Sequence, residues 1–265
     1  MIKNITFAVV LTLAFVVSAT AAPKKLLVVT VTTGYRHGSI PTAEKVLGEM
    51  AKKSGAFTVD YVRQSEGTDV ATVAKEVTEK MTLENLKKYD GVIFANTTGD
   101  LPLPDKEGFI NWLKSGKAFI GMHSATDTLH SFPPYIEMIG AEFSHHPAIT
   151  EVECINLDPA HPACKALPKT WPVTDEIYMF KSYDPKKVHL LLKLDKDPGN
   201  KAQAGEFPIA WCSEFGKGKV FYTELGHRDE VWNDENYQKH VLGAIKWALG
   251  LEKATDTHPA IEPKP

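Results

Sequence analysis

Three short segments of the chain are apolar almost without interruption, and they constrain the fold more than any other feature. They are residues 25–32 (KLLVVTVT), 91–95 (GVIFA) and 118–121 (AFIG). Runs of this kind are typical of strands that are buried on both faces of a parallel sheet, whereas strands with one solvated face alternate apolar and polar residues. The sequence therefore predicts a central sheet that is covered by helices on both faces.

Amphipathic segments separate these strands. Apolar residues recur at helical spacing after the first strand, from Ala43 to Ala51, and a second helix is expected over residues 104–115, ending at Gly116. A further strand is expected over residues 57–62. The alternation of strand and helix predicts an α/β fold with a mostly parallel sheet.

The second half of the chain is richer in strand patterns. Glycines and lysines at residues 214–219 form a turn that joins two of the expected strands in an added β-hairpin region, and a helix over 237–249 closes the domain. No internal repeat and no linker rich in Gly or Ser is visible, so we expect one domain over residues 22–251 and a flexible tail over 252–265. The expected strands are 150–157, 171–178, 188–194, 208–213 and 220–225.

The N-terminus has the pattern of a secretory signal peptide over residues 1–21. Lys3 precedes an apolar run over residues 5–17, and small residues follow up to Ala22. The run is shorter than the roughly 20 residues that a membrane span needs, although a retained anchor is the alternative. Cleavage after Ala21 would give a secreted or periplasmic protein that has no membrane contact.

Composition and net charge limit the kinds of molecule that the protein is expected to bind. The chain has 265 residues, 43% of them hydrophobic, which is enough for one sizeable core, and its formal net charge is −3. Because no basic stripe is present, nucleic acid is not expected as a partner, and a small molecule fits better. Of the three cysteines, Cys154 and Cys164 could form a disulfide, but a fully reduced set fits as well. The oligomeric state stays open.

Polar side chains follow several of the expected strands. Ligands of open parallel sheets bind outside the carboxyl ends of the strands, so residues at these positions are candidates for a site. Each also has a plainer interpretation, as a helix cap, an ordinary turn or a surface ion pair. The residues at strand ends are Arg36, His37, Asn96, Thr97, Asp100, His123, Asp127, His227 and Arg228.

His123 occupies the most informative of these positions. Gly121 and Ala125 flank it in the segment GMHSA, and this spacing resembles the G-x-S-x-G elbow that presents a nucleophile at a tight strand-to-helix turn. An imidazole at such a corner can act as a general base, carry a proton or bind a metal. A turn of small residues with an incidental histidine is the alternative.

Two chemistries suit this set. In one, imidazoles and a carboxylate bind zinc or a similar divalent ion, with His145 and His146 as candidate ligands. In the other, His123 is the acid or base, and Asp127, His37 or Glu176 assists it. The sequence has no G-x-G-x-x-G after a strand, so no nicotinamide cofactor is expected. The expected substrate-binding residues are Arg36, Asn96, Thr97, Asp100, Tyr178, His227 and Arg228.

An ordered set of motifs carries a family resemblance from about residue 25 to 251. The chain resembles the ThuA-like (trehalose utilisation) family of the class I glutamine amidotransferase-like superfamily, and this implies a flavodoxin-like sheet with a reactive elbow. The motifs are GYRH (34–37), NTTGD (96–100), GMHSATD (121–127), FSHHP (143–147), DEIY (175–178), PIAW (208–211), GKGKVFY (216–222) and GHR (226–228).

The chain departs from the superfamily at one decisive position. Amidotransferases carry Cys at the elbow, with a distant His-Glu pair, whereas this chain has His123 and no H-x-E after it. Glutamine hydrolysis is therefore not expected. The resemblance implies instead an exported protein that acts on a disaccharide or keto-sugar carbohydrate. A sugar-binding module without catalysis, or a scaffold with a vestigial site, are the alternatives.

Overall fold

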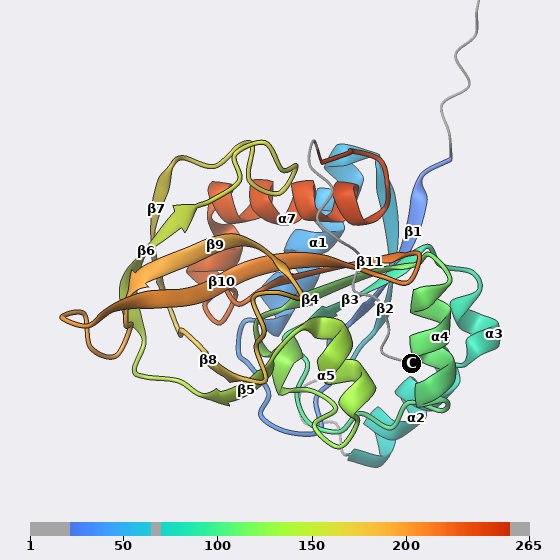
Figure 1. Cartoon of the computed structure of the whole chain (residues 1–265). Coiled ribbons are helices and arrows are strands. Elements are labelled where there is room, and N and C mark those ends of the chain that lie inside the picture. The colour runs from blue at the N-terminus through green and yellow to red at the C-terminus, as the bar shows by residue number, and fades with distance from the viewer. Residues whose placement is uncertain (1–21, 65–69, 255–265) are drawn as a thin grey trace, which may run out of the picture.

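The computed structural model describes residues 22–64 and 70–254, which form a nine-stranded sheet with helices on both of its faces (Figure 1). The strand order is β2-β1-β3-β4-β11-β10-β9-β6-β7. The expected signal peptide lies outside the described residues, as do residues 255–265 of the expected tail. Glu252, which the described part includes, pairs with Lys165 and Lys246.

Five neighbouring strands of this sheet are parallel. The three central ones are buried along almost their whole length, as their apolar sequences predict, and β11 extends the parallel set on the far side of β4. The parallel strands are β1 (Lys24–Val29), β2 (Phe57–Val62), β3 (Gly91–Ala95), β4 (Ala118–Met122) and β11 (Gly218–Thr223).

The remaining strands are antiparallel. β10 (Ala204–Phe215) pairs with β11 as the predicted hairpin, and β9 (His189–Lys196), β6 (Thr150–Asn156) and β7 (Thr170–Asp175) continue the sheet from there. The predicted α/β fold with an added hairpin region is confirmed. The antiparallel extension is larger than one hairpin, because β10 also pairs with β9 on its other edge, and β6 and β7 continue the sheet beyond β9.

A separate two-stranded sheet was not predicted. β5 (Glu142–His145) pairs with β8 (Met179–Lys181), and both are short and half-exposed, so they lack the long apolar pattern that indicates a strand. The segment after Arg228 was expected as a loop, but it forms α6 (Asp229–Asn233). Asp229 and Glu230 lie in the first turn of this helix, where acidic side chains favour the positive end of the helix dipole.

The helices cover the two faces of the sheet with separate cores (Figure 1). On one face, α1 (Ile40–Ser54) and α7 (Glu235–Ala248) pack against alternate residues of the parallel strands, such as Ile120 and Phe221. The residues between them, such as Phe119 and Tyr222, face the other core. That core is covered by α2 (Val70–Lys80), α4 (Lys106–Lys114) and α5 (Pro133–Ile139), and the short α3 (Leu83–Leu86) lies beside α4.

The described part of the chain settles two smaller points. The cysteines Cys154, Cys164 and Cys212 are free and buried, so the structure has the reduced set and not the disulfide. Within residues 22–64 and 70–254, no helix has both the length and the apolar character needed to cross a bilayer.

Candidate functional site

The corner after β4 places His123 at the carboxyl end of the parallel strands. β4 ends at Met122, a 3-10 helix (His123–Asp127) begins at once, and His123 has a positive φ of 48°. Gly121 allows the turn to pack closely, since a Cβ there would come within 3.1 Å of Ile139 and Tyr222. A non-glycine residue at positive φ is uncommon, so the surrounding structure holds the backbone in this conformation.

The His123 ring is wholly buried, and both of its nitrogens have defined contacts. Nδ1 lies 2.9 Å from the carbonyl oxygen of Glu224, which can only accept, so Nδ1 carries the proton and donates it. In the neutral ring, the lone pair is then on Nε2. This nitrogen faces His37 Nε2 at 3.2 Å and His227 Nδ1 at 3.3 Å. The backbone carbonyl therefore fixes which nitrogen of His123 is available to a ligand.

His37 and His227 reach this point from distant parts of the sequence. His37 lies between β1 and α1, and its Nδ1 is 3.4 Å from the Ser124 hydroxyl. His227 follows β11, and a buried carboxylate, Asp175, shapes its loop. Asp175 accepts hydrogen bonds from the backbone N–H groups of residues 226, 227 and 228 at 2.7, 3.3 and 3.2 Å. Asp175 therefore positions His227 without touching its ring.

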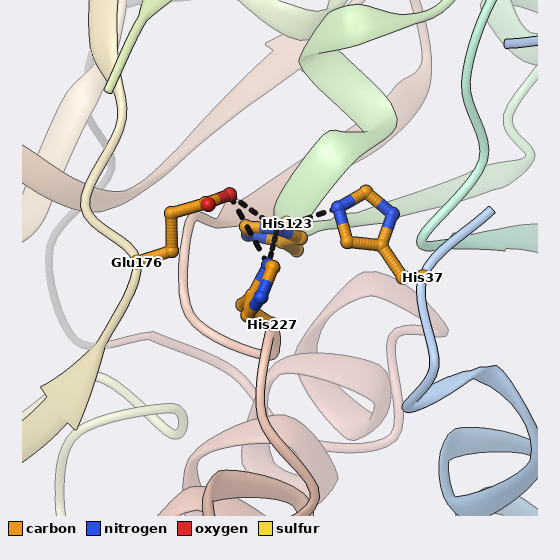
Figure 2. A group of neighbouring side chains, drawn as sticks. All are labelled: His37, His123, Glu176 and His227. Atoms are coloured by element: carbon orange, nitrogen blue, oxygen red, sulfur yellow. Dashed lines mark hydrogen bonds and ion pairs between the residues drawn. The ribbon is translucent and has the colours of Figure 1, made fainter. Parts of the chain in front are cut away.

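Glu176 completes the group from the antiparallel half. Its Oε2 lies 3.1 Å from His227 Nδ1 and 3.6 Å from His123 Nε2, and its Oε1 lies 3.2 Å from His146 Nδ1. Figure 2 shows the three rings and the carboxylate pointing at one another. We call these four residues, His37, His123, Glu176 and His227, the histidine cluster. One potential ligand atom from each residue lies within 4.8 Å of the other three.

The pKa values within the histidine cluster are shifted in different directions. Burial, together with the neighbouring His123 and His227, lowers the pKa of His37 to about 2. The hydrogen bond to Glu176 raises the pKa of His227 above its ordinary value, although burial opposes this. Burial disfavours the charged form of Glu176, but the nearby His123 and the hydrogen bond from His227 outweigh it and lower its pKa. In the metal-free cluster, Glu176 is therefore ionised and His37 is neutral.

Aromatic rings surround the cluster on its outer side. The Tyr178 ring centre lies 4.4 Å from that of His123, and the Phe143 ring packs against Tyr178 in a tilted arrangement with the ring centres 4.3 Å apart. Tyr35 is 67% exposed, and its ring lies 4.9 Å from the His37 ring. The side chain of His146 is 43% exposed. The cluster is thus closed on the His37 and His123 side and reaches solvent near His227 and His146.

Several predicted site residues have other partners. Asp127 bonds His130 at 2.7 Å, and Asp100 accepts from the backbone of Ser131. Arg36 donates to the carbonyl oxygens of Thr30 and Gln64, and Arg228 bonds Glu230 and the carbonyl oxygen of Thr174. Their predicted roles in substrate binding, or in catalysis for Asp127, stay predictions.

Asn96 and Thr97 are wholly buried. Asn96 donates to Ser39 Oγ and to the carbonyl of Gly226, so it ties the loop of His227 to the start of α1, whereas Thr97 bonds the Thr128 hydroxyl. His145, expected as a metal ligand beside His146, is exposed, and its Nδ1 bonds the Ser144 hydroxyl. The metal role of this pair stays a prediction.

Sequence reasoning missed the residues that hold the cluster in place. The motif DEIY contains Asp175 but does not indicate its role, and none of the motifs contains Glu224. Glu224 is fully buried, and burial raises its pKa well above the ordinary value. An acidic residue directly after the apolar strand 218–223 is the signal that could have revealed it.

Comparisons with known proteins agree on the family and the fold. The family model for ThuA, described as trehalose utilisation, matches residues 25–248. No curated protein matches the chain. The solved structure of a ThuA-like protein from Parabacteroides merdae is similar with a TM-score of 0.69 and 19% identity, over 89% of this chain and 93% of that one.

Two further solved structures bear on the fold alone. A ThuA-like protein from Bacteroides uniformis has a TM-score of 0.67 and 21% identity, over 89% of this chain and 95% of that one. A β-galactosidase from Bacillus circulans sp. alkalophilus has a TM-score of 0.53 and 10% identity, over 86% of this chain but only 31% of that one. The fold therefore also occurs as one part of a longer protein.

Proposed function

Because the chain belongs to the ThuA (trehalose utilisation) family, we propose that it is an exported enzyme that converts a disaccharide or keto-sugar, assisted by a divalent metal ion in the histidine cluster. The observation that carries the metal is the approach of four potential ligand atoms to within 4.8 Å of one another. Export rests on the pattern of residues 1–21, and the carbohydrate substrate rests on the family.

The spacing of the ligand atoms suits a first-row divalent ion such as zinc. Zinc bonds imidazole nitrogen at about 2.0–2.1 Å, so two ligands of a tetrahedral ion are about 3.3 Å apart. The contacts of His123 Nε2 with His37, His227 and Glu176 are 3.2, 3.3 and 3.6 Å. Imidazole and carboxylate donors are also the types that zinc binds in catalytic sites.

The hydrogen bonds around the cluster favour its nitrogens as ligands. Metal-bound histidines usually donate their other N–H to an oxygen, which fixes the ring. His123 already does so toward the Glu224 carbonyl, and the Ser124 hydroxyl is placed to accept from His37 Nδ1. His227 would have to move the proton that it shares with Glu176 off Nδ1, and a proton is released to solvent wherever the raised pKa keeps the ring protonated.

The chemistry of the site follows from its surroundings. A bound divalent ion would supply Lewis-acid polarisation of a sugar oxygen. Glu176 and His146, 3.2 Å apart, form the pair that can accept and pass on a proton at the solvent side. Tyr35, which is exposed beside His37, is the aromatic ring that would contact the apolar side of a sugar. If no metal is bound, His123 remains the candidate acid or base.

Elemental analysis of protein purified without chelator tests the proposal, with His123→Asn and His145→Asn as matched variants. We expect about one zinc per wild-type chain, which His123→Asn loses and His145→Asn retains. A metal that is lost only in His145→Asn would assign the ion to the exposed pair. Absence of metal even after zinc is added would remove the metal from the proposal.

Product formation then decides between enzyme and binding module. Wild-type protein, the chelator-treated protein and the two variants are incubated with disaccharides and their keto forms, and products are followed by chromatography. We expect turnover that chelation abolishes and zinc restores. Saturable binding of a sugar without any product, with or without metal, would favour the non-catalytic sugar-binding module. N-terminal sequencing of secreted or periplasmic protein, with Ala22 as the expected first residue, tests export.

A further inference from the structure

A cavity lies at the opposite end of the sheet from the histidine cluster. Its volume is about 360 Å³, within the usual range for small-molecule sites. Lys219, at the start of β11, lines this cavity, whereas His227 follows the end of the same strand. Four strand residues, 220–223, and the three residues 224–226 lie between them, and the strand part alone corresponds to about 13 Å. The two sites share no residue.

Positive charge gathers on the wall of this cavity. Four lysines from three separate segments line it, together with one carboxylate, that of Glu214. Lys219 Nζ donates to the Trp247 carbonyl and lies 4.8 Å from the centre of its ring. Lys187 is 3.9 Å from Glu137 in an exposed pair that contributes little. The lysines are Lys186, Lys187, Lys219 and Lys253.

The rest of the wall is largely apolar. Pro185, Val188 and Ala254 line it, and the Trp247 ring packs against the His161 ring at 5.1 Å. Such a surface suits the carbon body of a small organic molecule, and the lysines suit an anionic group at one end of it. The combination selects against a bare inorganic ion, which would leave the apolar half uncovered.

The one pair in the cavity that could suggest catalysis, Cys212 with His161, is inert. His161 Nδ1 accepts a hydrogen bond from the Ala163 N–H, so the ring proton is on Nε2, which faces Cys212 Sγ at 3.7 Å. Burial lowers the pKa of His161 to about 4 and raises the pKa of the Cys212 thiol. A neutral imidazole beside a protonated thiol does not generate the thiolate that nucleophilic chemistry needs.

We propose that this cavity is a second binding site that takes a small organic anion, with the carboxylate or phosphate group among the lysines and the ring or chain against Val188 and Trp247. The site binds and does not react, and it is independent of the histidine cluster. This proposal therefore does not depend on whether the cluster holds a metal or turns over a sugar.

Fluorescence of anilinonaphthalene sulfonate, an organic anion with aromatic rings, tests the proposal on the whole protein. The variant with Lys186→Glu and Lys253→Glu reverses two of the charges. Its matched control carries Lys45→Glu and Lys52→Glu on the exposed face of α1 and has the same net charge. We expect the dye to bind the cavity variant at least tenfold more weakly than the control, and the uncharged dye phenylnaphthylamine to differ less than twofold.

Competition distinguishes the two anionic groups and the need for a carbon body. We expect benzoate or phenyl phosphate to displace the dye, and whichever is stronger identifies the preferred anion. Inorganic phosphate at the same concentration should displace it at least tenfold less effectively. Equal dye affinity of the cavity variant and its control would overturn the proposal, and so would equal displacement by inorganic phosphate.

Discussion

Buried histidines lie toward both ends of the sheet, but only at one end do their nitrogens converge. At the carboxyl ends of the parallel strands, His123 Nε2 faces the rings of His37 and His227. Near the other end, His161 uses Nδ1 to accept from a backbone N–H and turns Nε2 toward the Cys212 thiol. Burial is the same in both places, so burial alone does not make a functional histidine.

The difference lies in what the second nitrogen meets. A carboxylate, Glu176, stands beside His123 and His227 and holds a proton on His227, whose pKa is raised. His161 has no such group on Nε2, and burial lowers its pKa to about 4. An imidazole with both nitrogens satisfied by the protein is structural, whereas one that presents a lone pair to other donors and a carboxylate is a candidate ligand.

Substitution of His123 should cause the largest loss of activity. Asn keeps much of the polarity and tolerates the positive φ at this position, so His123→Asn removes the Nε2 lone pair with little backbone cost. We expect turnover to fall at least a hundredfold, measured as kcat/KM on the substrate found by product screening. The matched variant His161→Asn should keep turnover within twofold. A His123→Asn protein with full activity would refute the assignment.

Removal of the negative charge from the cluster should have the next largest effect. In Glu176→Gln, the pKa of His227 falls toward its ordinary value, because the hydrogen bond and charge of Glu176 raise it in the wild type. Zinc affinity should fall at least tenfold, since an anionic ligand becomes neutral. NMR titration of the His227 ring and competition with a chelator measure the two effects. Glu214→Gln, at the far cavity, is the control and should change neither.

The hydrogen bonds from the His227 loop to Asp175 should contribute about 1–3 kcal/mol to the free energy of unfolding. Asp175→Asn replaces one acceptor oxygen by an NH₂ group, so at least one of the three backbone N–H groups of residues 226–228 is left unsatisfied. The free energy of unfolding in urea should fall by that amount, and zinc should also bind more weakly. The exposed Asp195→Asn should lie within about 0.5 kcal/mol of wild type. Equal stability of the two variants would contradict a positioning role for Asp175.

The smallest expected effect is the contribution of His161 to the pH dependence of stability. Because the folded-state pKa of His161 is about 4, below the value of 6.5 for an exposed ring, the unfolded chain binds one more proton in that interval. Stability therefore decreases as pH falls from 6.5 to 4, by about 1 kcal/mol per pH unit from this residue. His161→Asn should flatten the profile by that amount, measured by urea unfolding between pH 4 and 6.5 without added zinc. An unchanged slope in the variant would show that His161 is not the source.

The apolar strands and helical spacings were sufficient to predict the parallel part of the fold, because burial on both faces leaves a clear pattern. The extent of the antiparallel part was less clear, since β5 and β8 are too short and too exposed to differ from loops. His37, His123, Glu176 and His227 were each named from strand ends and motifs. Their meeting point could be inferred only from topology, and no local pattern gives the direction of a ring nitrogen.

The supporting residues were the hardest to foresee. Asp175 and Glu224 act from within the core, where an acidic residue gives no periodic signal. Asn96 and Thr97 resemble turn residues in the sequence, yet they are wholly buried, and Asn96 ties the loop of His227 to the start of α1. Turn-forming residue types therefore do not distinguish an exposed loop from a buried junction.

The histidine cluster joins residues that are far apart in the chain. His37 and His123 are separated by 86 positions, and His123 and His227 by 104. No fragment that lacks either end of the domain could assemble the set, and a newly made chain could not complete it until its last strand had docked. If the cluster takes up an ion, capture of that ion would mark the end of folding, and its release would weaken the cooperativity of the whole domain instead of loosening one loop.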